Sequence, residues 1–330
     1  MALSSPDEIL ESPGFQSGSK KVTSFFIAGN YSFLADHAMS KIRRSIYFAA
    51  MQTASRPASP VTTGYLESFM KNGYCVVDGI YSPQEIAEME RFFDEWRDSP
   101  DAFLENRDSL FSKVRLEDID RTKNLVRAIH PHRFSDRVMG WYTGPGVTAA
   151  LETLLGKPAF GAQTMYYYKP PGTCGQGMHQ DNFYLMAKPA TCIAAWTPID
   201  DADEENGCLL VVPGSHRWDM ICTGHEGSSW TVNAQGVIGH FPAGHKPQAV
   251  SVKRGQTMFF GGGVIHGSGP NRSKDRWRRT FIGHYVDETT ESLSRFYHPV
   301  VNMSGEVVST VAEHTGGGPC GDADWQGSAH

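Results

Sequence analysis

A histidine and an aspartate in the segment GMHQDNFYL, His179 and Asp181, are the first residues whose types and spacing suggest chemistry. If the segment is a strand, residues two apart project from the same face, so the two side chains would lie side by side. A neutral imidazole and a carboxylate can then supply two ligands to a divalent metal ion. The pair alone is weak evidence, because a chain with 13 histidines often contains H-x-D by chance, and the pair then has a structural role.

A third potential ligand, His266, stands at the end of an apolar run flanked by glycines in FFGGGVIHGSG. Glycines on both sides would let backbone and substrate approach closely. Two histidines and one carboxylate occupy one face of an octahedron and leave three positions open, which is typical of non-haem Fe(II) that activates O₂. We therefore predict that His179, Asp181 and His266 are the metal ligands and form the catalytic centre. Zinc and manganese stay open as alternatives, because the same ligands suit them.

Two arginines, Arg278 and Arg279, follow His266 by twelve and thirteen residues, in a run that indicates the next strand. Strand alternation allows only one of them to face inward. An inward arginine needs a carboxylate, which its planar fork binds in bidentate fashion. Ser268 could donate a second hydrogen bond, and Arg278 and Ser268 together would suit the distal carboxylate of 2-oxoglutarate. The alternative, a solvated basic loop, accounts for most charges in RSKDRWRR, and we predict Arg278 as the exception.

The elements that must position these residues change character along the chain. Gly73 should end a short amphipathic helix before a strand at 74–77, and Ser82 with Glu85 gives the capping box of a second helix. A further helix should end at Gly156. Beyond it, short runs rich in β-branched and aromatic residues, from TMYYY to RRTFIGHYV, are separated by Gly, Pro, Asn and Asp clusters. This order predicts an all-β core, a double-sheet barrel or jelly roll, with flanking helices and N-terminal helical support.

The same reading divides the chain into three parts. Residues 1–60 should be an N-terminal extension and linker, because they end in the turn-rich segment TASRPASPVTTG. Residues 61–314 should form the main domain, with a lid or insertion loop at about 217–248, and 315–330 a loose tail. The extension could pack on the main domain or on a second subunit, which suggests a homodimer, or remain a flexible arm.

Composition excludes some partners. The 330 residues contain 30 Lys and Arg against 36 Asp and Glu, a net charge of −6, which argues against binding to nucleic acid or a membrane surface. No apolar run reaches the ~20 residues of a membrane span. The N-terminus is acidic where a signal peptide would be basic, so we expect a cytoplasmic protein. The six cysteines are scattered without a C-x-x-C motif and should be reduced thiols, mostly small core or loop residues, with a disulfide framework as the weaker alternative.

From about Tyr65 to Val286 the sequence resembles the phytanoyl-CoA dioxygenase (PhyH-like) family of Fe(II)/2-oxoglutarate-dependent oxygenases. The matching segments, in order, are YYYKPPGTCGQGMHQDNFYL, WTPIDDADEENGCLLVVPGSHRW and HGSGPN followed by an arginine. The resemblance implies a double-stranded β-helix (cupin-like) fold, the three predicted ligands as an iron site, and Arg278 as the anchor of 2-oxoglutarate. In the usual family pattern the arginine follows the distal histidine by one residue fewer, so the choice between Arg278 and Arg279 stays open.

Several further residues are weaker candidates. Gln163 and Tyr167 alternate along one run and share a face, so both could touch the co-substrate if that face lines the barrel. The resemblance implies a polar residue near Gln163 and an aromatic residue at Trp196 beside 2-oxoglutarate, although a core role is the simpler one for Trp196. We interpret His216 as a loop anchor and His284 as a core histidine.

These residues predict an Fe(II)- and 2-oxoglutarate-dependent dioxygenase that uses O₂ and, in vitro, ascorbate. It would oxidise, most simply by hydroxylation, an unactivated C–H bond of a small or mid-sized organic substrate such as a secondary-metabolite intermediate, with release of succinate and CO₂. The carboxylate of Asp181 argues against halogenation, because related halogenases have a small residue there. Two alternatives stay open: a non-oxidative metal-dependent isomerase or hydrolase of the cupin type, and a catalytically inactive ligand-binding family member.

Overall fold

The computed structural model describes residues 58–98, 126–222, 238, 241 and 244–320 of the chain. The predicted N-terminal extension lies outside these residues except at its very end, and so do the last ten residues of the predicted tail. The extension, the tail and the homodimer therefore stay predictions.

The predicted insertion at 217–248 also lies largely outside the described residues, but two of its described residues contact strand β4 and the residue that follows it. The backbone N–H of Ile221 donates to the side-chain oxygen of Gln180 at 2.9 Å. The backbone N–H of Ile238 donates to the carbonyl of Met178 at 2.7 Å. These contacts anchor the described residues of the insertion, and its role as a lid stays a prediction.

The larger of two main sheets contains seven strands in the order β1-β8-β5-β10-β3-β12, with β2 also pairing with β3. All of its strand pairs are antiparallel. Its strands are β1 (Tyr74–Val77), β2 (Val126–Ile129), β3 (Ala159–Tyr168), β5 (Ile193–Pro198), β8 (Thr257–Gly261), β10 (Thr280–Asp287) and β12 (Val301–Asn302).

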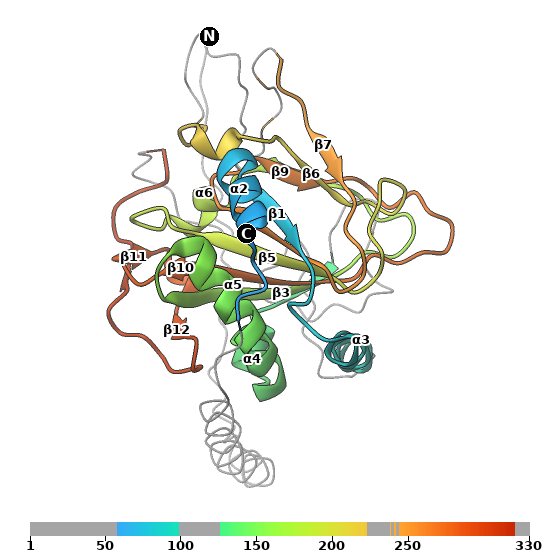
Figure 1. The fold of residues 1–330 in the computed structure, drawn as a ribbon, viewed down its shortest axis with the longest axis horizontal. Coiled ribbons are helices and arrows are strands. Elements are labelled where there is room, and N and C mark those ends of the chain that lie inside the picture. Colours follow the sequence, from blue (N-terminus) through green and yellow to red (C-terminus); the bar gives the residue numbers. More distant parts are fainter. Residues whose placement is uncertain (1–57, 99–125, 223–237, 239–240, 242–243, 321–330) are drawn as a thin grey trace, which may run out of the picture. The chain divides into compact units, whose positions relative to one another are not determined.

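The smaller sheet contains four antiparallel strands in the order β4-β9-β6-β7. In Figure 1 its labelled strands lie above β5, β10 and β3 of the larger sheet. Its strands are β4 (Gln176–His179), β6 (Leu209–Val211), β7 (Gln248–Val250) and β9 (His266–Ser268). A separate parallel pair joins β11 (Ser292–Leu293) to β13 (Ala312–Glu313).

One hydrophobic core lies between the two sheets. Met165 and Trp196 of the larger sheet belong to the same buried cluster as Leu209 and Val211 of the smaller sheet. Because side chains alternate along a strand, each long strand of the larger sheet also presents a second, outward face that must be covered.

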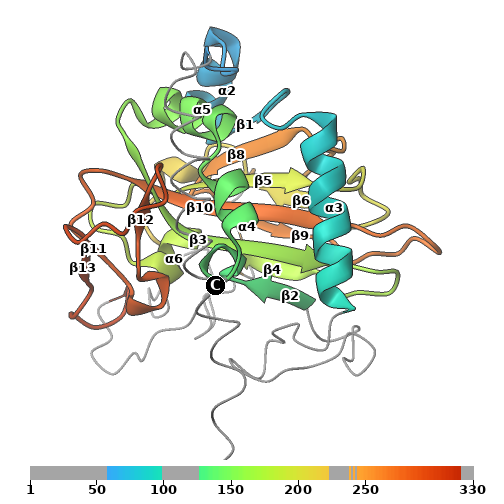
Figure 2. The same ribbon diagram turned by 90° about the horizontal axis from the view of Figure 1, so that it is seen from below.

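Helices cover the outward face of the larger sheet (Figure 2). Tyr166 and Tyr168 of β3 point away from the inner core into a second buried cluster, to which helix α3 contributes Phe93. The rings of Phe93 and Tyr166 stack at 3.8 Å between centroids, and the hydroxyl of Tyr168 donates to the carbonyl of Phe93 at 2.6 Å. The helices are α2 (Thr63–Asn72), α3 (Pro83–Arg97), α4 (Asp136–Tyr142), α5 (Pro145–Leu155) and α6 (Asp181–Leu185), with 3₁₀ turns η2 (Pro131–Arg133), η3 (Ser215–Arg217) and η4 (Arg295–Tyr297).

The predicted helix boundaries are confirmed where local signals set them. Ser82 and Glu85 form the capping box at the start of α3. Gly73 ends α2 with φ of +85°. A Cβ on Gly73 would lie 2.5 Å from Nδ1 of His216, so glycine is needed there both for the backbone and for space. His216 in turn reaches the carbonyl of Met70 at 3.2 Å, in agreement with its predicted role as a loop anchor.

The all-β core with flanking helices is thus confirmed, whereas the expectation for the cysteines is wrong in part. Cys222 and Cys320 form a disulfide, while the other four cysteines form none. The two half-cystines are 98 residues apart in the chain, and sequence spacing alone does not show that such distant residues meet.

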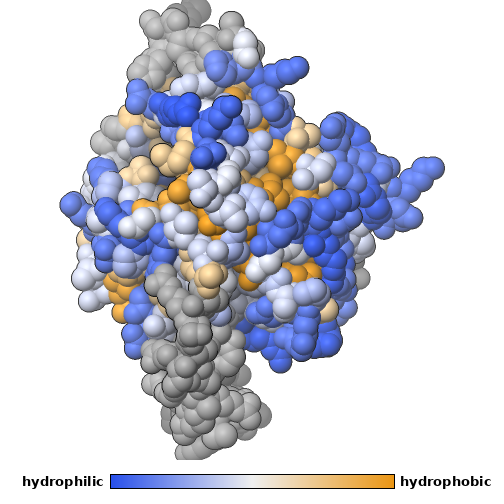
Figure 3. Space-filling view, in the orientation of Figure 1, coloured by the Kyte–Doolittle hydropathy of each residue, from blue (hydrophilic) through white to orange (hydrophobic). Residues whose placement is uncertain are grey.

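The surface agrees with a folded domain that encloses its hydrophobic residues. Figure 3 shows hydrophilic residues over most of the right-hand side of one face and hydrophobic residues mainly near its centre. Large hydrophobic side chains that are well exposed in the described part of the chain are Met70, Phe134 and Val307. No described helix has the length and apolar character of a membrane span.

His132 gives a test of this fold through the pH dependence of stability. Its ring is buried, with Nδ1 at 2.6 Å from Oγ1 of Thr164, and burial lowers its pKa to about 3. In the unfolded chain the pKa returns to about 6.5, so between these values only the unfolded state binds the proton. The stabilisation is therefore complete above about pH 6.5 and falls by up to ~1.4 kcal/mol per pH unit as the pH decreases.

We expect His132→Asn to reduce the loss of unfolding free energy between pH 7 and pH 5 by about 2 kcal/mol, measured by urea denaturation. Thr164→Val, which removes the hydrogen-bond partner but no titrating group, should lower stability at both pH values and keep the wild-type difference between them. An identical pH dependence in wild type and His132→Asn would contradict the prediction.

Candidate functional site

The three predicted metal ligands converge in the structure. His179 ends β4 and His266 begins the neighbouring strand β9, where the two are paired in register. Oδ1 of Asp181 lies 3.6 Å from Nε2 of His179 and 3.5 Å from Nε2 of His266. All three side chains are buried, and one ligand atom from each lies within 4.8 Å of the others, so the group could hold a metal ion.

The expectation that His179 and Asp181 share a strand is wrong. Strand β4 ends at His179, and Asp181 is the first residue of helix α6. The chain turns here because the backbone N–H of Asn182 donates to the carbonyl of Gly262 at 3.0 Å and the side chain of Gln180 donates to a backbone carbonyl. The carboxylate reaches the two imidazoles through this turn.

Backbone carbonyls orient both histidines for metal binding. Nδ1 of His179 lies 2.7 Å from the carbonyl of Gly177, and Nδ1 of His266 lies 3.0 Å from the carbonyl of Val264. A carbonyl only accepts, so Nδ1 carries the proton and Nε2 presents its lone pair toward Asp181. Burial lowers the pKa of His266 to about 4, which keeps this ring neutral at pH 7. The donor set therefore fits a divalent metal.

A third histidine adjoins the same carboxylate. Nε2 of His284, in β10, lies 3.3 Å from Oδ2 of Asp181. We interpreted His284 as a core histidine, and it is indeed buried, but its contact with Asp181 was missed. Alternation along β10 could have shown that His284 shares a face with Ile282 and Arg278, but not that this face meets Asp181.

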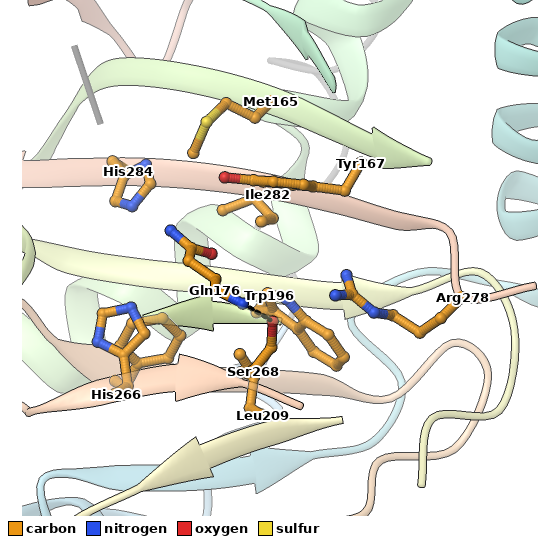
Figure 4. Close-up of a pocket in the computed structure, with 11 residues that line it drawn as sticks. Met165, Tyr167, Gln176, Trp196, Leu209, His266, Ser268, Arg278, Ile282 and His284 are labelled. Atoms are coloured by element: carbon orange, nitrogen blue, oxygen red, sulfur yellow. Dashed lines mark hydrogen bonds between the residues drawn. The ribbon is translucent and has the colours of Figure 1, made fainter. Parts of the chain in front are cut away.

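A pocket extends from these histidines between the two sheets (Figure 4). His266 and His284 lie toward one end in this view, Arg278 lies at the other, and Trp196 and Tyr167 lie between them. The residues that line it are Met165, Tyr167, Gln176, Trp196, Leu209, Phe260, His266, Ser268, Arg278, Ile282 and His284.

Arg278 is a buried cation without an acidic partner in the described part of the chain. Its side chain is 3% exposed, its guanidinium lies 5.7 Å from the ring centre of Trp196, and Nη1 donates to Oγ1 of Thr280 at 3.1 Å. Nε has no hydrogen-bond partner among the described residues. Burial lowers the pKa of Arg278 to about 10, so it stays charged at pH 7. A buried charge of this kind calls for an anionic ligand.

Arg279 points the other way, which shows which of the two arginines lines the pocket. Its guanidinium forms ion pairs with Asp200 at 2.7 Å, with Glu90 at 2.6 Å and with Asp94 at 2.7 Å. Glu90 and Asp94 belong to helix α3, so Arg279 joins the larger sheet to the helix that covers it.

The other candidates differ in their positions. Ser268, Tyr167 and Trp196 line the pocket, and the hydroxyl of Tyr167 accepts a hydrogen bond from Arg127 at 2.8 Å. Gln163 does not line this pocket. It faces inward opposite His284, fully buried, and neither atom of its amide has a hydrogen-bond partner among the described residues. The co-substrate contacts assigned to these four residues stay predictions.

The model of the phytanoyl-CoA dioxygenase (PhyH) family matches residues 69–280. The chain belongs to this family. It is therefore an enzyme of the 2-oxoglutarate-dependent non-haem iron dioxygenase class, and the predicted family and enzyme class are confirmed.

Two curated relatives show how far the family similarity extends. A Caenorhabditis elegans protein described as a probable phytanoyl-CoA dioxygenase is 29% identical over 278 residues, covering 78% of this chain and 84% of the relative. The peroxisomal phytanoyl-CoA dioxygenase of Rattus norvegicus is 26% identical over 261 residues and covers 75% of each chain.

Solved structures show the shared fold. The epimerase SnoN from nogalamycin biosynthesis, in complex with Fe³⁺ and alpha-ketoglutarate, has a TM-score of 0.56 at 21% identity, covering 69% of this chain and 84% of SnoN. EctD from S. alaskensis has a TM-score of 0.55 at 19% identity, covering 71% of this chain and 80% of EctD. At identities this low, the similarity to SnoN and EctD shows that this PhyH family member shares their fold, and no more than that.

The contact between His284 and Asp181 leads to a prediction about metal affinity. An imidazole N–H at Oδ2 would restrain the carboxylate so that Oδ1 faces the two ligand histidines. We expect His284→Ala to weaken Fe(II) binding about ten- to hundredfold, measured by anaerobic titration.

His284→Gln is the matched control, because its amide can place a donor near the same position. It should retain most of the metal affinity. Equal Fe(II) affinity in wild type and His284→Ala would contradict the restraint.

Proposed function

We propose that this enzyme oxidises a C–H bond of a small or mid-sized organic substrate at a site where His179, Asp181 and His266 bind Fe(II) and Arg278 binds 2-oxoglutarate. One observation carries the proposal. His266, one member of a buried metal-ligand group, and a buried arginine without an acidic partner among the described residues lie toward the two ends of one pocket (Figure 4). The two facing sheets support the view that the barrel is a double-stranded β-helix.

The protein's own residues would orient the reactants. His179, Asp181 and His266 would hold Fe(II), and three protein ligands would leave positions for 2-oxoglutarate and O₂. Arg278 would hold the distal carboxylate of 2-oxoglutarate, with the ring of Trp196 against its guanidinium. When bound, iron and O₂ supply the oxidising power, while 2-oxoglutarate is converted to succinate and CO₂ and the second oxygen atom enters the hydroxylated product.

The walls of the pocket support an organic substrate with an apolar part. Met165, Leu209, Phe260 and Ile282 line it and would pack against an apolar part of the substrate. Asp181 occupies the ligand position that halogenation would need free, which supports hydroxylation or a related oxidation. The relatives are named for phytanoyl-CoA, and the similar structure SnoN is named as an epimerase. We therefore propose oxidation of a C–H bond as the reaction, with a secondary-metabolite intermediate as one example of the substrate.

The decisive experiment measures succinate formed from 2-oxoglutarate under air, with added Fe(II) and ascorbate, across a panel of organic substrates. We expect succinate formation that requires O₂ and is abolished by Asp181→Ala. Failure to form succinate, together with stoichiometric zinc in the purified protein, would favour a non-oxidative metal enzyme. Absence of any bound metal would favour a ligand-binding protein without turnover.

Arg278 provides a separate prediction. Arg278→Leu removes charge-assisted hydrogen bonds worth about 1.5–3 kcal/mol, so KM for 2-oxoglutarate should rise about ten- to hundredfold. Fe(II) affinity should stay within about twofold of wild type, since Arg278 lies at the opposite end of the pocket.

Arg279→Leu is the matched control. It breaks the ion pairs to Asp200 and α3 and should lower stability while KM for 2-oxoglutarate stays near the wild-type value. A larger effect on KM from Arg279→Leu than from Arg278→Leu would reverse the assignment.

A further inference from the structure

Ser268 has its two acceptor positions occupied by donors. Nζ of Lys169 lies 3.0 Å from its Oγ, and the backbone N–H of Gln176 donates to the same atom at 3.3 Å. The bond from Gln176 is the dashed line in Figure 4. A serine hydroxyl has two acceptor lone pairs and one O–H donor. Because Lys169 and Gln176 both donate to Oγ, the hydroxyl proton of Ser268 must point away from these two donors. Ser268 lines the pocket, so this proton can be donated to a ligand there.

Lys169 is fixed in place by contacts at both of its ends. Its Nζ also donates to the carbonyl of Gly269, so its ammonium binds two successive residues of one segment. Its backbone carbonyl accepts from the backbone N–H of Arg278 at 3.0 Å and from the side chain of Asn271 at 2.9 Å. One residue directly after β3 thus sets the side chain of Ser268 and the backbone of Arg278.

Lys169 also places a second buried basic group behind this wall of the pocket. Lys169 is 1% exposed and Arg278 is 3% exposed, and neither forms a salt bridge with any described residue. Burial, and then the charge of Arg278, lower the pKa of Lys169 well below its usual value. Burying two basic groups that repel one another when both are protonated is costly, and an anionic ligand would offset that cost and favour the protonated amine.

From this geometry we propose that Lys169 is a positioning residue for the co-substrate. It holds Ser268 with the hydroxyl proton toward the pocket, and it adds a basic group that an anionic ligand would help to keep protonated. Together these features favour a 2-oxo acid with a second carboxylate over a 2-oxo acid with an apolar tail. The inference rests on the proposed function and extends it to a residue that lies behind the pocket wall.

The test compares the full-length enzyme with Lys169→Met, Lys169→Arg, Ser268→Ala and the Lys169→Met/Ser268→Ala double variant. KM and kcat are measured for 2-oxoglutarate, along with its direct binding by calorimetry and the competition by 2-oxopentanoate. Lys169→Met should raise KM for 2-oxoglutarate about tenfold or more, leave Fe(II) affinity within about twofold, and reduce the preference for 2-oxoglutarate over 2-oxopentanoate. Lys169→Arg, which keeps a basic side chain, should retain part of the preference for 2-oxoglutarate that Lys169→Met loses.

The double variant separates positioning from a general effect on folding. Because Lys169 acts partly through Ser268, its substitution should raise KM less in the Ser268→Ala background than in wild type. Fully additive effects would overturn the link between Lys169 and Ser268, as would an unchanged KM in Ser268→Ala. If Lys169→Met fails to fold, Ser268→Ala and Lys169→Arg still decide the question, since unchanged selectivity in both would overturn the inference.

The same data distinguish this inference from the proposed function. Tight binding of 2-oxoglutarate by wild type with no change in Lys169→Met overturns only the role of Lys169. Absence of 2-oxoglutarate binding by the wild-type, Fe(II)-loaded enzyme overturns the proposed function, and the role of Lys169 with it.

Discussion

A fully buried carboxylate surrounded by imidazoles is the constraint on which the rest of the site depends. Asp181 is 0% exposed, with one oxygen facing Nε2 of His179 and His266 and the other facing His284. Carbonyls hold the two ligand rings so that their lone pairs point toward the carboxylate. Lone pairs and an anion repel one another, and a cation between them converts that repulsion into three bonds. The fold thus preorganises the ligands before the metal binds.

The opposite end of the pocket contains buried basic side chains in place of a buried carboxylate. Arg278 is a buried cation and Lys169 a buried basic group, and neither forms an ion pair with an acid among the described residues. A pocket with metal ligands at one end and positive charge at the other matches a molecule that chelates a metal and ends in a carboxylate. Apolar side chains such as Leu209 and Ile282 line the pocket, and their low polarity would strengthen the electrostatic interactions at both ends.

Strand geometry keeps the two ends at a fixed separation. Strand β9 carries both His266 and Ser268. Strand β10 begins shortly after Arg278, and His284 lies further along it on the same face. The neighbouring Arg279 uses the opposite face of the same run to bind α3 and Asp200. One arginine is therefore available to a ligand because the next one fastens the segment to the helical layer.

Local signals in the sequence determined the helix ends at Gly73 and Ser82, the strand-rich second half and the chemical types of the ligands, because each depends on residues close together in the chain. The ordered motifs were enough to indicate the family. Only the tertiary structure decided that Asp181 begins a helix, that His284 reaches it and that Arg278 is the arginine in the pocket. These facts depend on where segments up to a hundred residues apart come into contact, and on which face of a strand is buried there, and no short-range pattern encodes that meeting.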